Sequence, residues 1–322
     1  MENLKEYKEL VSKLPALKKE IGKIIVGQEE AIDEVLIALL AGGHCLLEGV
    51  PGLAKTLMVK TLAEALDMTF KRIQFTPDLM PGDIVGTEVM EEHEGKKTFV
   101  FNKGPLFAHV VLADEINRTP PKTQSALLEA MQEYKVTYSG TTYQLPKPFF
   151  IIATQNPIEQ AGTYPLPEAQ LDRFLLYIKL NYPTEQEELM VLKNTTGTRN
   201  VPLQSVFTEK EIQTLQDLCR QVHITDELLA KVNGLVRSTR PADSTSDFVK
   251  QWCDWGAGPR AGQALVLCAK ARALMQGRFS VVPEDISALA KPVLRHRIAL
   301  NFKAEAEGIS ADKVIENLVW KS

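Results

Sequence analysis

The chain has 322 residues, a length that suits two domains better than one, because domains usually hold about 100–200 residues. Apolar residues make up 44% of it and charged residues 24%, which argues against a disordered chain. With 37 Lys and Arg against 41 Asp and Glu, the net charge is -4, whereas proteins that bind the nucleic-acid backbone usually carry a basic excess. We therefore expect a folded two-domain protein without a nucleic-acid partner.

The sequence also argues against export and membrane insertion. Residues 1–20 are rich in Lys and Glu and contain no apolar signal-peptide segment. No window holds the roughly 18 uncharged apolar residues that a membrane span requires. The cysteines lie far apart, without a Cys-x-x-Cys pair or zinc-ribbon spacing, at Cys45, Cys219, Cys253 and Cys268. The expected location is a reducing cytoplasm.

The first half of the chain alternates between helical and strand patterns. Apolar residues recur at helical spacing over residues 4–23 and 29–40, and Gly42-Gly43 ends the second helix. Short apolar runs predict buried strands at residues 44–48, 110–113, 149–153 and 175–180. Helices are expected between them at residues 56–66 and 123–133. Buried strands that alternate with helices predict a parallel sheet with helical crossovers.

Two segments interrupt this alternation and are predicted to be hairpins. Residues 88–101 run out and back across His93-Glu94-Gly95, and residues 135–145 do so across Ser139-Gly140. Both turns contain the glycine that tight reversals favour.

The last third of the chain is predicted to be helical. No strand is expected after Tyr182-Pro183, and helices are expected at residues 225–237, 260–276 and 284–297. Trp252 and Trp255 are expected to pack inside this part. The sequence therefore predicts an α/β domain at residues 1–195 and a helical domain at residues 196–322.

The turn after the first strand has the composition of a phosphate-binding loop. It contains, in order, Gly49, Val50, Pro51, Gly52, Leu53, Ala54, Lys55 and Thr56, followed by Leu57. Glycines let backbone N–H groups turn toward phosphate oxygens, and the start of a helix adds positive potential. Lys55 is expected to reach the outer phosphates, and the Thr56 hydroxyl is expected to bind Mg²⁺. The alternative is an incidental strand-to-helix turn.

One position departs from the usual loop pattern, because Ala54 stands where glycine is usual. We expect Gly52 to supply any left-handed conformation in the loop. Alanine is then tolerable at position 54 if that residue already has right-handed helical angles.

The strand predicted at residues 110–113 ends in two acids, Asp114 and Glu115. Asp114 is expected to hold Mg²⁺ through water, and Glu115 is expected to orient and activate an attacking water. A strand that ends in Asp-Glu is weak support by itself. It becomes strong beside the phosphate loop, which we expect on a neighbouring strand, since Thr56 and Asp114 would then share one metal ion.

Several further strings occur in the order found in one family of ATPases. They are LLEGVPG (46–52), ADEINR (113–118), the segment 123–134, ATQNP (153–157), LPEAQLDRF (166–174) and GPR (258–260). Together they resemble an AAA+ ATPase, and in detail the MoxR family, over residues 26–297. The resemblance implies a P-loop NTPase fold: a parallel sheet sandwiched by helices, a C-terminal all-α lid and two inserted hairpins. It also implies ATP as substrate together with Mg²⁺.

The resemblance assigns roles to residues outside the phosphate loop. Val26-Gly27-Gln28 is similar to the segment that packs beside adenine. Asn156 resembles the polar sensor that positions the lytic water. Arg260 resembles the second sensor, which contacts the outer phosphates and couples them to the angle of the lid.

Two arginines are candidates for action across a subunit interface. Arg173 resembles the arginine finger, which acts on ATP bound by the neighbouring subunit and whose planar guanidinium stabilises the transferred phosphoryl group. Arg118 is a second candidate, although it could equally be a surface arginine in a salt bridge.

The hairpins gain an interpretation from the same resemblance. One is inserted at about residues 81–103 and the other lies at residues 135–145, and their tips are expected to point toward a ring pore or an attached partner. The alternative is that they only extend the edge of the sheet.

The function implied is that of a homo-oligomeric, hexameric ring ATPase. It would remodel, mature or activate protein clients in the manner of a chaperone, with a partner that carries a von Willebrand factor A domain. The alternatives are a DNA-associated motor, a nucleotide-dependent assembly module with negligible turnover, and an activase devoted to one enzyme, similar to the CbbQ group.

Overall fold

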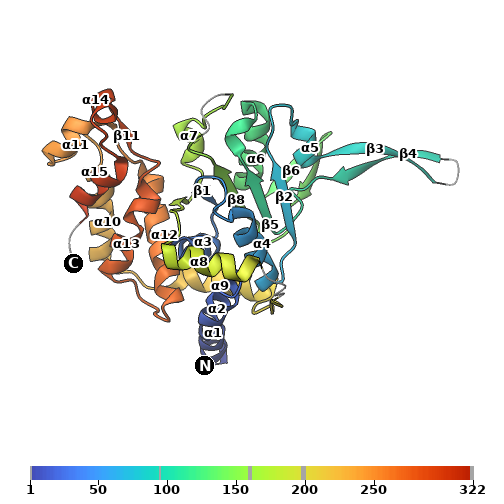
Figure 1. The fold of residues 1–322 in the computed structure, drawn as a ribbon, viewed down its shortest axis with the longest axis horizontal. Coiled ribbons are helices and arrows are strands. Elements are labelled where there is room, and N and C mark those ends of the chain that lie inside the picture. Colours follow the sequence, from blue (N-terminus) through green and yellow to red (C-terminus); the bar gives the residue numbers. More distant parts are fainter. Residues whose placement is uncertain (1, 94–95, 159–161, 197–200, 320–322) are drawn as a thin grey trace.

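The computed structural model describes residues 2–93, 96–158, 162–196 and 201–319, which form an α/β core and a helical lid that lie side by side (Figure 1). Within these ranges, no helix combines the length and the apolar character that crossing a bilayer requires.

The centre of the core is a parallel sheet with the strand order β2-β5-β8-β1-β9. Its strands are β1 (Cys45–Glu48), β2 (Phe70–Gln74), β5 (Val110–Asp114), β8 (Phe150–Gln155) and β9 (Leu176–Lys179). The four predicted strands are confirmed. The sequence did not reveal β2, because this edge strand exposes Lys71 and Arg72 and lacks a continuous apolar run.

The order of the strands corrects one expectation. The phosphate loop and the acidic pair were expected on neighbouring strands, but β8 lies between β1 and β5. Leu47 of β1 pairs with Thr154 of β8, and Ala113 of β5 pairs with Ala153. Residues that follow β8 therefore lie between the two motifs.

Helices cover both faces of the sheet, as expected for this fold. They are α1 (Glu2–Ser12), α2 (Leu14–Ile21), α3 (Glu29–Leu40), α4 (Lys55–Ala65), α5 (Pro81–Val85), α6 (Pro121–Glu133), α7 (Glu168–Leu171) and α8 (Glu185–Thr195), with a 3₁₀ turn η1 (Ile116–Arg118). Successive residues of a strand point to opposite faces. Val110 and Leu112 pack with α3 and α4, whereas Val111 and Ala113 pack with α6.

Both hairpins are present. They are β3 (Gly86–His93) with β4 (Lys96–Lys103), and β6 (Lys135–Tyr138) with β7 (Thr141–Gln144). The first projects far from the body (Figure 1), and its expected turn at Glu94-Gly95 lies outside the described residues. Phe101 of β4 stacks on Tyr143 of β7, with ring centroids 4.4 Å apart, and so joins the bases of the two hairpins.

The lid is helical, as expected, with one short strand pair in addition. Its helices are α9 (Glu209–Gln221), α10 (Asp226–Ser238), α11 (Asp247–Trp252), α12 (Pro259–Met275), α13 (Pro283–Leu294), α14 (Phe302–Ala306) and α15 (Ala311–Leu318). The expectation of no strand after Tyr182-Pro183 is wrong, because β10 (Cys253–Trp255) pairs antiparallel with β11 (Ala299–Leu300). Trp252 is buried as predicted, but Trp255 is 70% exposed.

Candidate active site

The phosphate loop lies between the carboxyl end of β1 and the first residue of α4. Its two glycines serve different purposes. A Cβ atom on Gly49 would lie 2.9 Å from Leu180 Cβ, so this position needs the space, whereas Gly52 has a φ of 90°. Lys55 Nζ donates a hydrogen bond to the Gly49 carbonyl at 2.5 Å, so the lysine side chain lies across the loop.

Ala54 does not have the right-handed angles that the sequence argument required. Its φ of 54° and ψ of 25° are left-handed, and it is the N-cap residue of α4. Glycine is the residue that adopts these angles without strain. An L-residue in this conformation costs about 1–2 kcal/mol.

A cavity of about 400 Å³ opens beside the loop and includes much of the predicted nucleotide-binding set. The predicted residues that line it are Val26, Gln28, Pro51, Gly52, Leu53, Ala54 and Leu57; Gly27, Gly49, Val50, Lys55 and Thr56 do not line it. Gln28 Nε2 donates to the Asn181 carbonyl at 2.6 Å, which ties the 26–28 segment to the end of the core. A pocket of this size with a largely apolar lining fits a nucleotide base.

The other wall of the cavity comes from α8 and was not predicted. Tyr182, Pro183 and the face of α8 that carries Val191 and Leu192 line it. The signal was present in the sequence as Thr184-x-x-Glu187, a capping box in which Glu187 Oε2 accepts from the Thr184 amide at 2.7 Å.

Gly27 allows α8 to approach this closely. A Cβ atom at position 27 would lie 2.8 Å from the Glu187 carboxylate, and the φ of Gly27 is 70°. Gly27, which was predicted to lie beside adenine, does not line the cavity but leaves room for the helix that forms its wall.

Asp114 is buried at the end of β5 and held by two neighbouring strands. Thr154 Oγ1, from β8, donates to Asp114 Oδ1 at 2.6 Å. Arg72, from β2, donates to Asp114 Oδ2 from Nη2 at 2.7 Å and from Nε at 3.0 Å. The carboxylate therefore has a fixed orientation toward the carboxyl edge of the sheet.

Glu115 follows in a left-handed conformation, with φ 58° and ψ 49°. Its amide donates to Thr154 Oγ1 at 2.8 Å. Its Oε2 accepts from Gln74 Nε2 at 2.7 Å and forms an ion pair with Arg118 Nη1 at 3.1 Å. Backbone strain of this kind persists only where surrounding contacts fix it, and it is common at functional sites. Arg118 is thus engaged in a salt bridge within its own chain.

Asn156 lies directly after β8 and therefore between the phosphate loop and the acidic pair. Its side chain is buried, and Oδ1 accepts from the Ile158 amide at 3.2 Å. This position suits a polar group that contacts a water held between the two motifs.

Arg173 and Arg260 are not beside the phosphate loop. The Leu175 amide donates to the His44 carbonyl at 2.7 Å, so the backbone after Arg173 lies at the amino end of β1. A four-residue strand spans about 13 Å, which separates this point from the loop. Arg260, in the first turn of α12, forms an ion pair with Asp172 at 3.6 Å.

The donor set matches Mg²⁺ better than a metal held by protein alone. In the described part of the chain, no group of three or more His, Cys, Asp or Glu side chains could hold an ion. Mg²⁺ is usually bound by one or two protein oxygen ligands together with substrate phosphates and water. Thr56, in the first turn of α4, and the oriented Asp114 fit that pattern.

Comparisons with known proteins match both parts of the chain. Residues 44–176 match the ATPase family associated with various cellular activities (AAA), and residues 249–318 match the AAA lid domain. The Mycobacterium tuberculosis protein named Chaperone MoxR1 is 43% identical over 93% of this chain and 79% of its own length. Protein MoxR of Methylorubrum extorquens is 30% identical over 88% and 86%. A crystal structure from Cytophaga hutchinsonii is 45% identical, with a TM-score of 0.92 over 98% of this chain and 96% of that one.

The fold, the loop and these matches define the class of protein: an AAA ATPase with a lid domain, which binds and hydrolyses ATP. Within that class, the chain belongs to the MoxR family.

Proposed function

We propose that this MoxR-family ATPase works as a homo-oligomeric, hexameric ring that uses ATP hydrolysis to remodel, mature or activate protein clients, together with a partner that carries a von Willebrand factor A domain. The observation that carries the catalytic part is the meeting of three motifs at one edge of the sheet, after β1, β5 and β8. The chaperone part rests on the name of the relative MoxR1.

The residues at this edge divide the chemistry among them. Lys55 and the loop amides bind the phosphates, and Val26, Gln28 and Leu57 contact the base. Glu115 orients the attacking water, and Asn156 contacts that water from the strand between. Mg²⁺, held by Thr56 and Asp114, supplies charge neutralisation at the phosphoryl oxygens when bound.

Arg173 completes the site of a neighbouring subunit in this proposal. Support comes from its position at the amino end of β1, away from its own phosphate loop. Arg118 is the weaker candidate, because it already pairs with Glu115 of its own chain. Arg260 is the proposed second contact to the outer phosphates, and its exposed ion pair with Asp172 leaves it able to make that contact.

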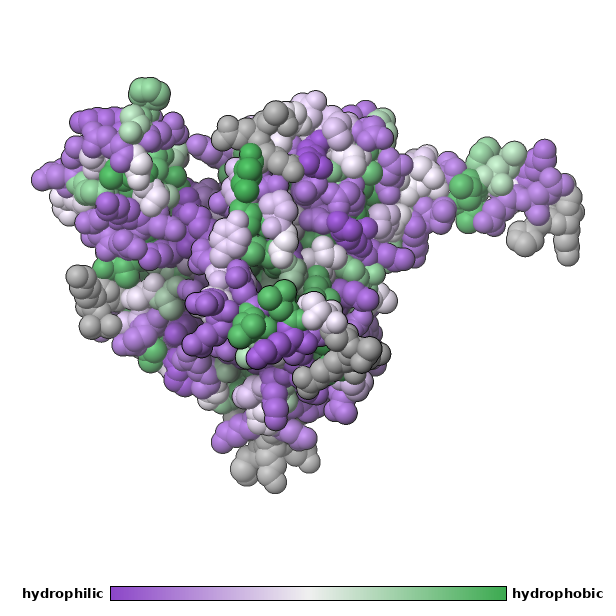
Figure 2. All heavy atoms as spheres, viewed as in Figure 1, coloured by the Kyte–Doolittle hydropathy of each residue, from purple (hydrophilic) through white to green (hydrophobic). Residues whose placement is uncertain are grey.

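The β3–β4 hairpin is the proposed contact surface for the client or the partner. Val89, Met90, Phe99 and Val100 are exposed along it, and Figure 2 shows apolar residues gathered partway along this arm. Exposed apolar groups on a projecting element favour protein contact.

The proposal also places the domain boundary at residues 195/196 and the protein in the cytoplasm. The four buried free cysteines support the cytoplasmic location.

The catalytic assignment is tested with Glu115→Gln. This variant keeps the size and position of the side chain but loses the charge that activates water, so ATP turnover should fall at least about a hundredfold. The affinity for a fluorescent ATP analogue should stay within about threefold of wild type. Phosphate release and fluorescence titration measure the two quantities.

Lys55→Ala is the matched contrast, because it should lose nucleotide affinity itself. Unchanged turnover in Glu115→Gln would show that Glu115 does not activate the attacking water. Tight ATP binding by Lys55→Ala would show that the loop around Lys55 is not the phosphate-binding loop. Client identity is then approached by pull-down with Glu115→Gln held in its ATP state, with Lys55→Ala as the control bait.

A further inference from the structure

Three consecutive lid residues, at positions 295–297, bind the core segment that carries Arg173. Arg297 makes most of these contacts. Its Nε donates to Asp172 Oδ1 at 2.7 Å, and its Nη2 donates to the carbonyls of Phe174 at 2.8 Å and Asp172 at 3.3 Å. Its Nη1 donates to the carbonyls of Leu175, at 3.3 Å, and Val293. A planar guanidinium can satisfy such a set, whereas an ammonium cannot.

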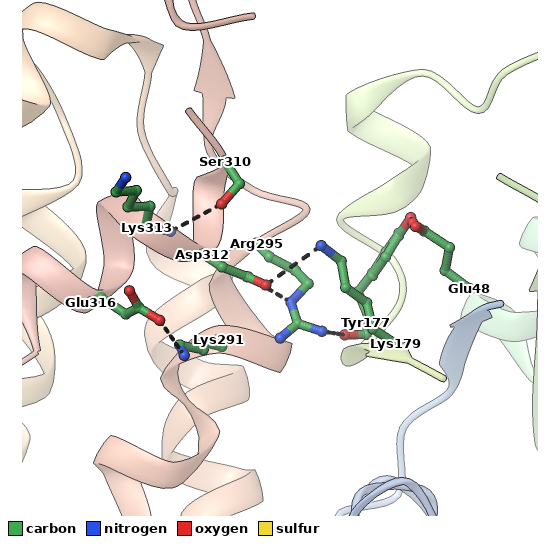
Figure 3. A network of polar contacts seen from close by, with 9 residues as sticks. All are labelled: Glu48, Tyr177, Lys179, Lys291, Arg295, Ser310, Asp312, Lys313 and Glu316. Atoms are coloured by element: carbon green, nitrogen blue, oxygen red, sulfur yellow. Dashed lines mark hydrogen bonds and ion pairs between the residues drawn. The ribbon is translucent and has the colours of Figure 1, made fainter. Parts of the chain in front are cut away.

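The two preceding residues bind the same stretch of chain a little further on. His296 Nε2 lies 3.1 Å from the Phe174 carbonyl, and the ring stacks on Tyr177. Arg295 donates to the Tyr177 carbonyl at 3.1 Å and to Asp312 at 2.9 Å, as Figure 3 shows. The three residues that follow α13 therefore all contact the core segment 172–177.

The contact of Arg297 with Asp172 is made by a buried side chain, whereas Arg260 reaches the same carboxylate from an exposed position. The Arg297 side chain is 4% exposed, so its hydrogen bonds are made away from water. The Arg260 side chain is 59% exposed, and its ion pair with Asp172, at 3.6 Å, is the kind of surface contact that contributes little. Arg260 can leave Asp172 while Arg297 keeps hold of it.

Arg173 lies inside the segment that Arg297 fixes. The residues on both sides of it, Asp172 and Phe174, accept hydrogen bonds from Arg297. Among the described residues, none forms an ion pair or hydrogen bond with the Arg173 guanidinium that would orient it. The base of this side chain is therefore positioned by the backbone and, through it, by the lid.

We propose that Arg297 is a positioning residue for Arg173: its buried hydrogen bonds hold the Asp172–Leu175 backbone in one conformation at the edge of the sheet, and this conformation sets the reach of Arg173 into the neighbouring site. This inference rests on the proposed action of Arg173 across the interface.

The test uses Arg297→Lys in the full-length assembly. Lysine keeps the positive charge near Asp172 but cannot serve the carbonyls, so turnover should fall about tenfold or more. Affinity for the ATP analogue, measured in the same samples, should stay within about twofold. Arg272→Lys is the matched control, because Arg272 makes a comparable ion pair with Asp285, at 2.6 Å, between two lid helices.

Mixing with Glu115→Gln subunits separates a positioning role from damage to the variant's own site. Glu115→Gln subunits cannot hydrolyse ATP but carry an intact Arg173. Turnover per Arg297→Lys subunit should rise about fivefold in an equal mixture, because about half of its neighbours then supply a well-placed arginine. A purely structural loss in the variant's own site would give no such rise.

The same mixture with Arg173→Ala shows which idea fails. If Arg173→Ala is rescued and Arg297→Lys is not, the positioning role is wrong and the trans arginine stands. If neither variant is rescued, Arg173 does not act across the interface, and the positioning role of Arg297 is wrong as well. If Arg297→Lys does not fold, Asp172→Ala, which removes the acceptor of Arg297 Nε, is tested beside Arg260→Ala, which loses only the exposed pair with the same carboxylate. Equal turnover in these two variants overturns the inference.

Discussion

Ala54 carries backbone strain at the centre of the phosphate loop. Glycine is usual here, and the structure gives the reason, since the residue is left-handed with φ 54°. Glu115 is left-handed as well, and it is fixed by Thr154, Gln74 and Arg118. Both strained residues belong to the candidate site, where such strain is common.

Ala54→Gly should therefore stabilise the protein. The substitution removes the strain of a left-handed alanine, but glycine also gives the unfolded chain more conformational freedom. The net effect should raise the free energy of unfolding by about 0.5–1 kcal/mol. Urea unfolding measures it. Ala230→Gly is the control, since Ala230 is an exposed residue inside α10, where glycine should cost about 1 kcal/mol. If both variants lost stability equally, Ala54 would not be strained in the folded protein.

At the scale of elements, the start of α13 depends on one buried carboxylate. Asp285 accepts from Arg272 at 2.6 Å, from Arg278 at 2.7 Å and from the Val282 amide at 2.9 Å. Burial by itself would raise the pKa of Asp285, but the hydrogen bonds from Arg278, Val282 and Arg272 outweigh it and hold the pKa below its usual range. This group joins α12 to α13, the helix that ends at Leu294, three residues before Arg297.

Asp285→Asn should destabilise the protein by about 3 kcal/mol at pH 7, because it leaves two arginines without their buried partner. The contribution of the carboxylate is complete above the ordinary pKa of about 3.9 and is lost as the pH falls through the lowered folded-state value. The difference from wild type in denaturant unfolding should thus narrow in acid. Asp243→Asn, at an exposed pair with Arg237, should cost under about 1 kcal/mol. Equal effects at the two sites would contradict the buried network.

At the scale of the whole molecule, the catalytic groups are divided between two ends of the sheet. The loop, Glu115 and Asn156 lie at the carboxyl edge, while the segment with Arg173 lies beside His44 at the other. One chain therefore does not bring every proposed group to one place, which is why the proposed function assigns Arg173 to the site of a second copy.

Specific ATPase activity should consequently rise with protein concentration. An arginine that acts across an interface is worth about 10³–10⁵ in turnover, so diluted subunits should be at least about a hundredfold less active than assembled ones. Sedimentation velocity gives the assembled fraction at each concentration. Arg173→Ala should assemble without this rise. Constant activity through dissociation would mean that each subunit is complete.

Most strands of the sheet and the phosphate site could be predicted from the sequence, because neighbouring residues encode them. The apolar runs predicted four strands, and a loop of glycines ending in Lys55-Thr56 predicted a phosphate site, since strand ends and helix starts follow from neighbouring residues. Strand β2 could not be predicted, because this exposed edge strand lacks an apolar run. The α8 wall of the cavity was signalled only by Thr184-x-x-Glu187.

The sequence by itself determined which chemical groups the protein has and the order in which they occur: the loop, the acidic pair, the sensor and the arginines. Only the tertiary structure decided which of them meet. It placed β8 between the two nucleotide motifs, Arg72 on Asp114, and Arg297 on the segment of Arg173. Such contacts join residues far apart in the chain, and they depend on strand order and packing, which no local pattern specifies.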